Sequence, residues 1–135
     1  KNRTAGNIRK NLQNFGGNLG SNGSTSHFFD NFGIIQFEKE GISDEKALDY
    51  AATAGAKDCF SFKDFHEIIT IKEDFYRVKN EIEKLAKKIN YSGIEWRPKN
   101  KESLKKEDKK KMLNLLEILE EDDDVQKVFH NCILI

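Results

Sequence analysis

The stretch DCFSFKDFHEIITI, Asp58 to Ile71, predicts a β-hairpin near the middle of the chain. Its two arms are Asp58–Phe62 and His66–Ile71, and the second is rich in the β-branched residues that strands favour. Helical patterns lie on both sides of the hairpin. The region around it therefore reads as a unit in which helices pack on a sheet.

The segments that flank the hairpin predict one helix on each side. A helix begins after Ser43, carries Asp44 and Glu45 in its first turn, and ends at Gly55. Carboxylates in a first turn interact favourably with the positive end of the helix dipole. A long amphipathic helix follows the hairpin, with apolar residues at helical spacing: Phe75, Val78, Ile82, Leu85 and Ile89.

A strand closes this middle unit. Ile94 and Trp96 alternate with polar residues, and Pro98, the single proline of the chain, ends the pattern. The middle unit therefore runs helix, strand, strand, helix, strand. It either recruits a first strand near Ile34–Phe37 or lacks one.

The amino-terminal segment predicts a helix and a strand. Thr4 is suited to cap the helix, because its hydroxyl can accept from an early free amide. Gly16 and Gly17 suit a left-handed cap at the other end, and a strand is expected over Thr25–Phe29. The apolar face of this helix consists of Ala5, Ile8, Leu12 and Phe15.

Further elements of this outer unit lie on both sides of the middle unit. Asp30–Gly33 is typical of a four-residue turn, and Ile34–Phe37 predicts a second strand. Near the other end, the acidic run Glu120–Asp124 stops a last helix, and Val125–Ile135 predicts a final strand. The apolar face of that helix consists of Met112, Leu115, Leu116 and Leu119.

The element order predicts an α+β fold with two split-βαβ (ferredoxin-like) α/β sandwich domains, one inserted into the other. The expected domains are a discontinuous one, residues 1–38 plus 100–135, and an inserted one, residues 39–99. The first strand of the discontinuous domain is missing from this pattern. We therefore expect this chain to be the carboxy-terminal part of a longer protein, or to follow a segment that is not included.

The charge of the chain is balanced in total but not in distribution. The 135 residues hold 23 basic and 23 acidic side chains, while residues 1–29 hold Lys1, Arg3, Arg9 and Lys10 without any Asp or Glu. A basic region of this kind can bind phosphates whatever the total charge. Two isolated cysteines, Cys59 and Cys132, favour a reducing compartment over a disulfide scaffold. No stretch of the sequence is long and apolar enough to span a membrane.

The glycine-rich stretch FGGNLGSNGSTSHFF, residues 15–29, resembles several phosphate-binding loops only superficially. It has no lysine, and neither the P-loop spacing nor GxGxxG occurs in it, which excludes a nucleotide-hydrolysing loop. Residues 17–20 match the bare GxxG of RNA-clamping KH domains. A helix cap with a flexible loop is favoured over direct backbone contact with phosphate. The structural glycines are Gly16, Gly17, Gly20 and Gly23.

The basic end is the predicted nucleic-acid-binding site. Two of its cations lie just before the start of a helix, where free amides and the dipole also favour anions, and the other two lie on the polar side of that helix. A solvated helix face without a partner explains the same pattern equally well. The predicted contact residues are Lys1, Arg3, Arg9 and Lys10, with Asn18 in the loop as a secondary contact.

Catalytic and metal sites have little support in the sequence. His130 and Cys132 lie on one face if they share a strand, but no second pair of ligands accompanies them, so a packed strand is favoured over a metal or a Cys–His pair. The run Glu120–Asp124 is expected to be a solvated helix stop or a partner contact. We predict no catalytic residue, no metal, no cofactor and no enzymatic activity.

A family resemblance covers essentially the whole chain. Asn2-Arg3-Thr4, the helix end Phe15–Gly20, Gly23-Ser24 and the closing Asp123–Asn131 resemble the YebC/PmpR family, and Ala54–Asp58 is similar to its inserted domain, as are Asp74-Phe75 and Val78-Lys79. The family includes the mitochondrial translational activator of cytochrome c oxidase. Its members have an amino-terminal helical domain, an α/β domain and a third domain inserted into the second. The present chain resembles the second and third.

The resemblance implies a regulator of gene expression that is not an enzyme. Bacterial members are commonly described as DNA-binding transcriptional regulators, and others act as ribosome-associated translation factors. DNA or ribosomal RNA is therefore the expected partner, in the cytoplasm or, in a eukaryote, in the mitochondrion. No membrane is expected as a partner, and the resemblance implies no oligomeric state. A protein-interaction module that contacts no nucleic acid is the alternative of a different class.

Overall fold

The computed structural model describes residues 2–135, so that Lys1 lies outside the described residues. The described chain divides into two compact units. A middle unit comprises Asn31–Trp96, and an outer unit comprises the segments before and after it, up to Asp30 and from Arg97. The predicted boundaries were 38/39 and 99/100.

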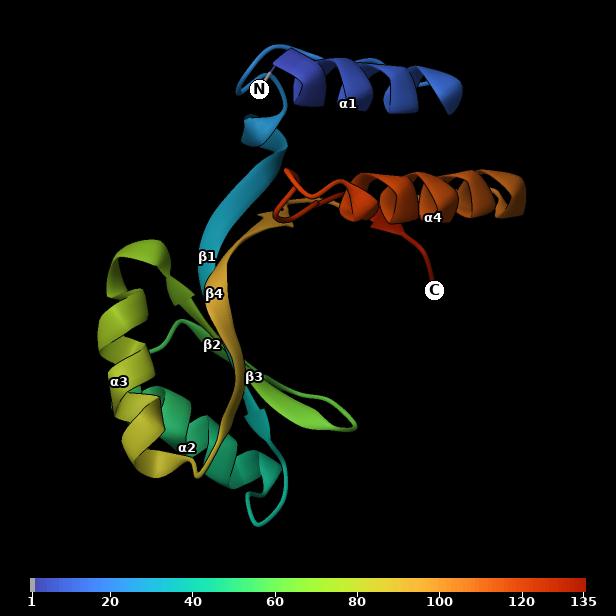
Figure 1. The fold of residues 1–135 in the computed structure, drawn as a ribbon. Helices are drawn as coiled ribbons and strands as arrows, with labels where there is room; N and C mark the ends of the chain where they lie inside the picture. Colours follow the sequence, from blue (N-terminus) through green and yellow to red (C-terminus); the bar gives the residue numbers. More distant parts are fainter. Residues whose placement is uncertain (1) are drawn as a thin grey trace. The chain divides into compact units, whose positions relative to one another are not determined.

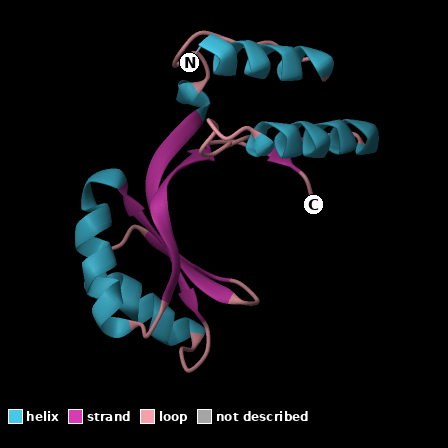
Figure 2. Ribbon diagram, viewed as in Figure 1, coloured by secondary structure: helices cyan, strands magenta, loops and turns pink. Residues whose placement is uncertain are grey.

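The middle unit consists of a four-stranded sheet and two helices, which Figures 1 and 2 show. Its strand order is β2-β3-β1-β4, and β3 runs antiparallel to both β1 and β2. The hairpin β2–β3 is the one that the sequence predicted. The elements are β1 (Phe29–Glu38), α2 (Asp44–Ala54), β2 (Asp58–Ser61), β3 (Phe65–Ile71), α3 (Phe75–Leu85) and β4 (Ile89–Pro98), with a 3₁₀ turn at Lys72–Asp74.

Helix α2 begins and ends where its sequence predicts. The Ser43 hydroxyl accepts a hydrogen bond from the Lys46 amide at 3.1 Å, which satisfies one of the free amides of the first turn. Gly55 adopts a left-handed conformation with φ of 75°, which a residue with a side chain rarely does. Small residues on one face, Ala47, Ala51 and Ala54, let the helix approach the sheet closely.

The core of the middle unit lies between its helices and one face of the sheet. Ile35 and Phe37 of β1 face Ile68 of β3, and Val78 and Ile82 of α3 pack against the same cluster. All five side chains are fully buried. Alternation along the strands and helical spacing along α3 bring these apolar groups together.

A buried histidine joins the sheet to the loop before α2. His66 has no exposed surface, and its Nε2 lies 2.8 Å from the carbonyl oxygen of Ile42. Its Nδ1 lies 2.7 Å from the hydroxyl of Ser61. Both ring nitrogens therefore have partners, as a buried polar side chain requires.

Strand β1 corrects the predicted turn. The expected turn at Asp30–Gly33 and the strand at Ile34–Phe37 form one continuous strand. Gly33 pairs with Thr70, and a Cβ at Gly33 would lie 2.6 Å from Cγ2 of Thr70. The glycine therefore permits close packing inside the sheet instead of a turn. Of the two alternatives left open, the middle unit recruits the strand near Ile34–Phe37.

Helix α3 is shorter than predicted. It ends at Leu85, because Ala86 already has an extended backbone with ψ of 143°. Ile89, expected on the apolar face of the helix, begins β4 instead. Its spacing fits the end of a helix and the start of a strand equally well, so periodicity alone could not decide.

The outer unit consists of two helices, a 3₁₀ turn and a two-stranded sheet. Helices α1 and α4 lie side by side (Figure 1), and β5 and β6 are parallel. None of the helices in the described chain is long and apolar enough to cross a bilayer. The elements are α1 (Asn2–Asn14), the 3₁₀ turn (Ser26–Phe28), β5 (Glu102–Ser103), α4 (Lys106–Glu121) and β6 (Cys132–Ile133).

Three predictions for the outer unit are wrong. The strand expected over Thr25–Phe29 is mainly a 3₁₀ turn, whose last amide, that of Phe28, donates to the carbonyl oxygen of Thr25. The strand expected over Val125–Ile135 is reduced to β6, because only its parallel partner β5 supplies hydrogen bonds. Thr4 lies inside α1 and does not cap it; its hydroxyl donates to the Asp124 carboxylate instead.

Candidate nucleic-acid interface

Helix α1 presents its three described cations to solvent. Arg3, Arg9 and Lys10 are all exposed, whereas Ile8 and Leu12, which lie roughly opposite Arg3 on the helix, are half-buried. At about 100° per residue, Arg3 and Lys10 lie almost on one line along the helix, and Arg9 lies about a third of a turn from Arg3. The structure therefore brings three of the predicted contact residues onto one exposed face. Lys1, the fourth cation, lies outside the described residues.

This exposed face of α1 carries no acidic side chain. Helix α1 contains no Asp or Glu, and among the described residues no salt bridge involves Arg3, Arg9 or Lys10. Gly6 lies in the middle of the face, and a Cβ placed there meets no atom within 4 Å. The surface between the cations is therefore low and open. Successive phosphates of a nucleic-acid backbone could approach these cations without displacing an internal partner.

The glycines after α1 first serve to end the helix. Gly16 has φ of 82°, its amide donates to Gln13, and the amide of Gly17 donates to Leu12 at 2.8 Å. These two amides satisfy helix carbonyls and are not available to a phosphate. Asn18 is exposed in the loop that follows.

The remaining glycines shape the loop that leads to the 3₁₀ turn. A Cβ at Gly20 would lie 2.6 Å from Oγ of Ser24, so the chain folds tightly there. Gly23 has φ of 79°, and its carbonyl oxygen accepts from the Ser26 hydroxyl at 3.0 Å. The loop is thus turned by its own hydrogen bonds and delivers the chain to His27 in a defined conformation.

An exposed aromatic pair ends this loop. The rings of His27 and Phe28 have centroids 4.0 Å apart and are tilted by 38°. The Phe28 side chain is 53% exposed, although the backbone on both sides of it is hydrogen-bonded. Its carbonyl oxygen accepts from the Lys99 amide at 2.9 Å. A large apolar ring therefore projects into solvent from a hydrogen-bonded stretch of backbone.

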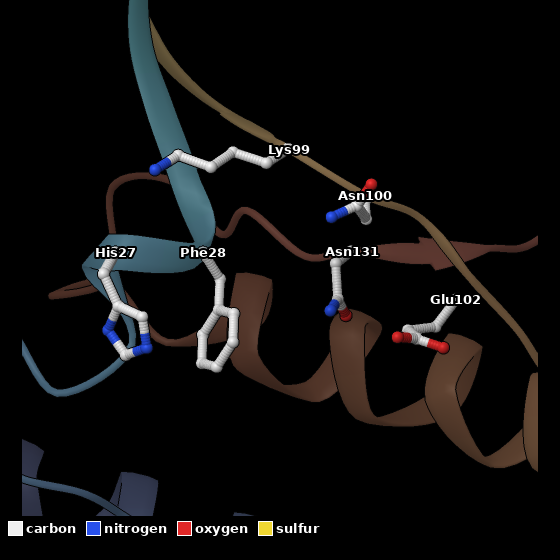
Figure 3. A pocket seen from close by; sticks show the side chains of 6 residues that line it. All are labelled: His27, Phe28, Lys99, Asn100, Glu102 and Asn131. Atoms are coloured by element: carbon white, nitrogen blue, oxygen red, sulfur yellow. The ribbon is translucent and has the colours of Figure 1, made fainter.

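The aromatic pair forms one end of a pocket of about 500 Å³ within the outer unit. Figure 3 shows side chains from three segments of the chain around it. The Glu102 amide donates to the Asn131 carbonyl oxygen at 2.6 Å, which fixes two of these segments together. Sequence reasoning missed this pocket, and its one local signal was the pair His27-Phe28 after the glycines. The lining residues are His27, Phe28, Lys99, Asn100, Glu102 and Asn131.

The cysteines lie in surroundings that disfavour the reactive thiolate. Burial raises the pKa of Cys132, and the Glu102 carboxylate raises it further. Burial likewise raises the pKa of Cys59, followed by Asp58 and Asp44. A catalytic thiol requires the opposite shift.

The neighbourhood of Cys132 does not form a metal centre. His130 accepts a hydrogen bond from the Cys132 amide at 3.0 Å through Nδ1, which ties that ring nitrogen to the backbone. Within residues 2–135, no three Cys, His, Asp or Glu side chains are grouped so that they could hold a metal ion. The hydrogen bond between His130 and the Cys132 amide therefore stabilises the local backbone conformation.

The acidic run after α4 is attached to α1. The Asp122 carboxylate accepts from the Asp124 amide at 2.9 Å and turns the chain as the helix ends. Asp124 in turn accepts from the Thr4 hydroxyl at 2.5 Å, in the first turns of α1. A carboxylate there interacts favourably with the positive end of the helix dipole.

Comparison with known proteins gives one family. Residues 1–132 match the family model described as "TACO1/YebC second and third domain". A protein of Pelagibacter ubique is 44% identical over 97% of this chain and 54% of its own length. One of Thermoanaerobacter pseudethanolicus is 45% identical over 97% of this chain and 54% of its own length. Both are named probable transcriptional regulatory proteins.

A solved structure shares the fold. The crystal structure of a conserved hypothetical protein from Aquifex aeolicus matches with a TM-score of 0.87 and 36% identity, over 98% of this chain and 55% of that one. The chain thus spans about half the length of the relatives that it matches. Because the family model covers nearly all of it, this chain belongs to the TACO1/YebC family.

Proposed function

We propose that this chain is part of a nucleic-acid-binding regulator of gene expression, and that the exposed face of α1 contacts phosphates. The observation that carries the proposal is the set of three exposed cations, Arg3, Arg9 and Lys10, on a helix without an acidic residue. The names of the relatives support a regulatory role. The proposed partner is DNA, and the proposed role is not enzymatic.

The electrostatics of α1 favour a contact through its side chains over one through its amino-terminal end. Asp124 already accepts from Thr4 near that end, so part of the positive dipole is neutralised within the protein. Arg3 and Lys10 lie farther round the helix, on the solvent side. Each cation that pairs with a phosphate releases condensed counterions, which makes the affinity dependent on salt.

The experiment measures binding of the intact protein to duplex DNA by fluorescence anisotropy over a series of salt concentrations. The triple variant Arg3→Ala, Arg9→Ala, Lys10→Ala is expected to bind more weakly, and the slope of log K against log salt is expected to fall by about 2 to 3 units. A matched control removes three exposed lysines of the middle unit: Lys46, Lys63 and Lys87. An unchanged slope in the α1 variant, or an equal change in the control, would contradict the proposal.

A ribosome-associated translation factor is the second candidate function. The exposed pair His27 and Phe28 favours it, because structured RNA presents unpaired bases that can stack on aromatic rings. Sedimentation of the intact protein with ribosomes, compared with gel shift on promoter DNA at matched salt, separates the two candidates. Capture of a protein partner that survives the α1 substitutions would point to an interaction module instead.

The order of the helices and strands also bears on the domain organisation. We infer a split-βαβ arrangement for the middle unit from the order β1-α2-β2-β3-α3-β4 and the strand order β2-β3-β1-β4. Both ends of the chain fall in the outer unit, which supports an inserted middle domain. Expression of residues 31–96 alone tests this inference, since an inserted domain is expected to unfold cooperatively by itself.

A further inference from the structure

The pocket beside the 3₁₀ turn brings together chemically different groups that the contact through α1 does not use. Its volume of about 500 Å³ lies within the range of small-molecule sites in proteins. The lining combines two aromatic rings, two amides, one amine and one carboxylate. These groups come from His27, Phe28, Asn100, Asn131, Lys99 and Glu102.

We propose that this pocket binds an unpaired nucleobase of a single-stranded nucleic acid and prefers bases that carry an exocyclic amino group. The proposal rests on the proposed function, because it names the form of nucleic acid that the outer unit binds. Duplex DNA hides its bases in the stack, so a site of this kind selects unpaired segments.

The aromatic pair supplies the stacking surface. Phe28 is 53% exposed, and its ring lies against that of His27 at a centroid distance of 4.0 Å. The Phe28 amide and carbonyl groups are both hydrogen-bonded, to Thr25 and Lys99, so the backbone that carries the ring is fixed before a ligand arrives. Stacking of a base on such a ring contributes without regard to base identity.

The polar end of the pocket supplies the preference. Glu102 is exposed, and an ionised carboxylate can only accept hydrogen bonds. The exocyclic amine of cytosine donates to such a group, whereas uracil has a carbonyl oxygen in the same place, which the carboxylate repels. The amide of Asn131 can serve either base, because it has both a donor and an acceptor.

The Lys99 amine can bind the phosphate backbone of a single-stranded nucleic acid. Figure 3 shows the Lys99 amine and the Glu102 carboxylate well separated from each other, with the side chains of Asn100 and Asn131 in the region between them. A phosphate can therefore approach Lys99 without facing Glu102. This separation of charges fits a nucleotide, which carries its negative charge away from the edge of the base.

The experiment measures binding of the intact protein to labelled 12-nucleotide DNA strands of deoxycytidine and of deoxyuridine at fixed salt. We expect the deoxycytidine strand to bind about tenfold more tightly. Glu102→Gln is expected to remove most of that difference, because an amide also donates. Phe28→Ala is expected to weaken binding of both strands about tenfold, and Phe28→Tyr to restore it.

A matched control is Phe60→Ala, which removes an exposed phenylalanine of the middle unit that is 44% exposed. It should leave both affinities unchanged. Circular dichroism verifies that each variant folds. If Phe28→Ala does not fold, Phe28→Tyr, which should still bind both strands, keeps the test decisive. Deoxycytidine monophosphate distinguishes a free nucleotide from a strand: if it binds as tightly as the 12-mer, the assignment to a strand is overturned.

The outcomes separate this inference from the proposed function. Binding that depends on the α1 cations but not on Phe28, with equal affinity for the two strands, overturns the inference and leaves the proposed function intact. A protein that binds neither duplex nor single strand overturns both. A deoxycytidine preference that Glu102→Gln removes, together with loss on Phe28→Ala, supports the pocket as a base-binding site.

Discussion

The amide of Lys99 donates a hydrogen bond to the carbonyl oxygen of Phe28 at 2.9 Å. This one bond joins two segments that are about seventy residues apart in the sequence, and it fixes the backbone of both at the rim of the pocket. The glycine-rich stretch before Phe28 thus has a structural consequence: it ends α1, turns tightly, and delivers an aromatic pair to a fixed position. The proposed phosphate contacts are made by side chains of α1 and by Lys99, and not by the glycines.

The close packing around Gly33 predicts opposite effects for alanine at two glycines. Gly33→Ala should lower the free energy of unfolding by about 1 to 3 kcal/mol, because its Cβ would meet Cγ2 of Thr70 at 2.6 Å and Cδ1 of Phe75 at 2.7 Å. Gly6→Ala should raise it by about 1 kcal/mol, since alanine favours a helix and nothing lies within 4 Å. Urea unfolding of both variants measures this. Equal effects at the two positions would contradict the assignment of Gly33 to a packed strand.

The buried His66 should be among the most sensitive side chains of the middle unit. His66→Ala should lower the free energy of unfolding by about 2 to 4 kcal/mol, because it leaves a cavity and removes the partner of the Ile42 carbonyl oxygen. His27→Ala, at an exposed position, is the matched control and should change it by less than about 0.5 kcal/mol. Thermal or urea unfolding compares the two. A small effect at His66 would mean that water replaces its hydrogen bonds.

The two thiols should react slowly at neutral pH. Burial raises the pKa of both cysteines, so the thiolate forms only at a pH above the ordinary range for a free thiol, and alkylation should accelerate as the pH rises through it. Asp58→Asn removes one negative charge that raises the pKa of Cys59, so this pKa should fall and the rate at a given pH should increase. Mass spectrometry after iodoacetamide treatment measures each site. Fast reaction of wild-type Cys59 at pH 7 would contradict the prediction.

The local elements of the fold could be predicted from the sequence because their determinants are neighbours in the chain. The hairpin Asp58–Ile71 and the capped helix from Ser43 to Gly55 are of this kind. Gly33 was misread because Asp-x-x-Gly fits a turn locally, whereas the contact with Thr70 that requires a glycine is formed across the sheet. The local sequence pattern could not predict that contact.

The two candidate sites differ in how far the sequence could predict them. The exposed cations of α1 follow from helical periodicity, so Arg3, Arg9 and Lys10 could be grouped from the sequence. The pocket could not be predicted, because its lining comes from three segments joined by backbone hydrogen bonds between distant residues. The sequence pattern predicted a strand at Phe28, whereas the structure has a 3₁₀ turn there with the Phe28 side chain 53% exposed.

The bond between Thr4 and Asp124 predicts a measurable link between the acidic run and α1. In a double-mutant cycle of Thr4→Val and Asp124→Asn, we expect a coupling of about 0.5 to 1 kcal/mol in the free energy of unfolding, since the bond is exposed. Asp124→Asn also removes a negative charge near the positive end of α1, so affinity for duplex DNA should rise about twofold at low salt. Thr4→Val keeps that charge and should leave affinity unchanged. If both variants bind DNA as the wild type does, Asp124 acts on the stability of the outer unit alone.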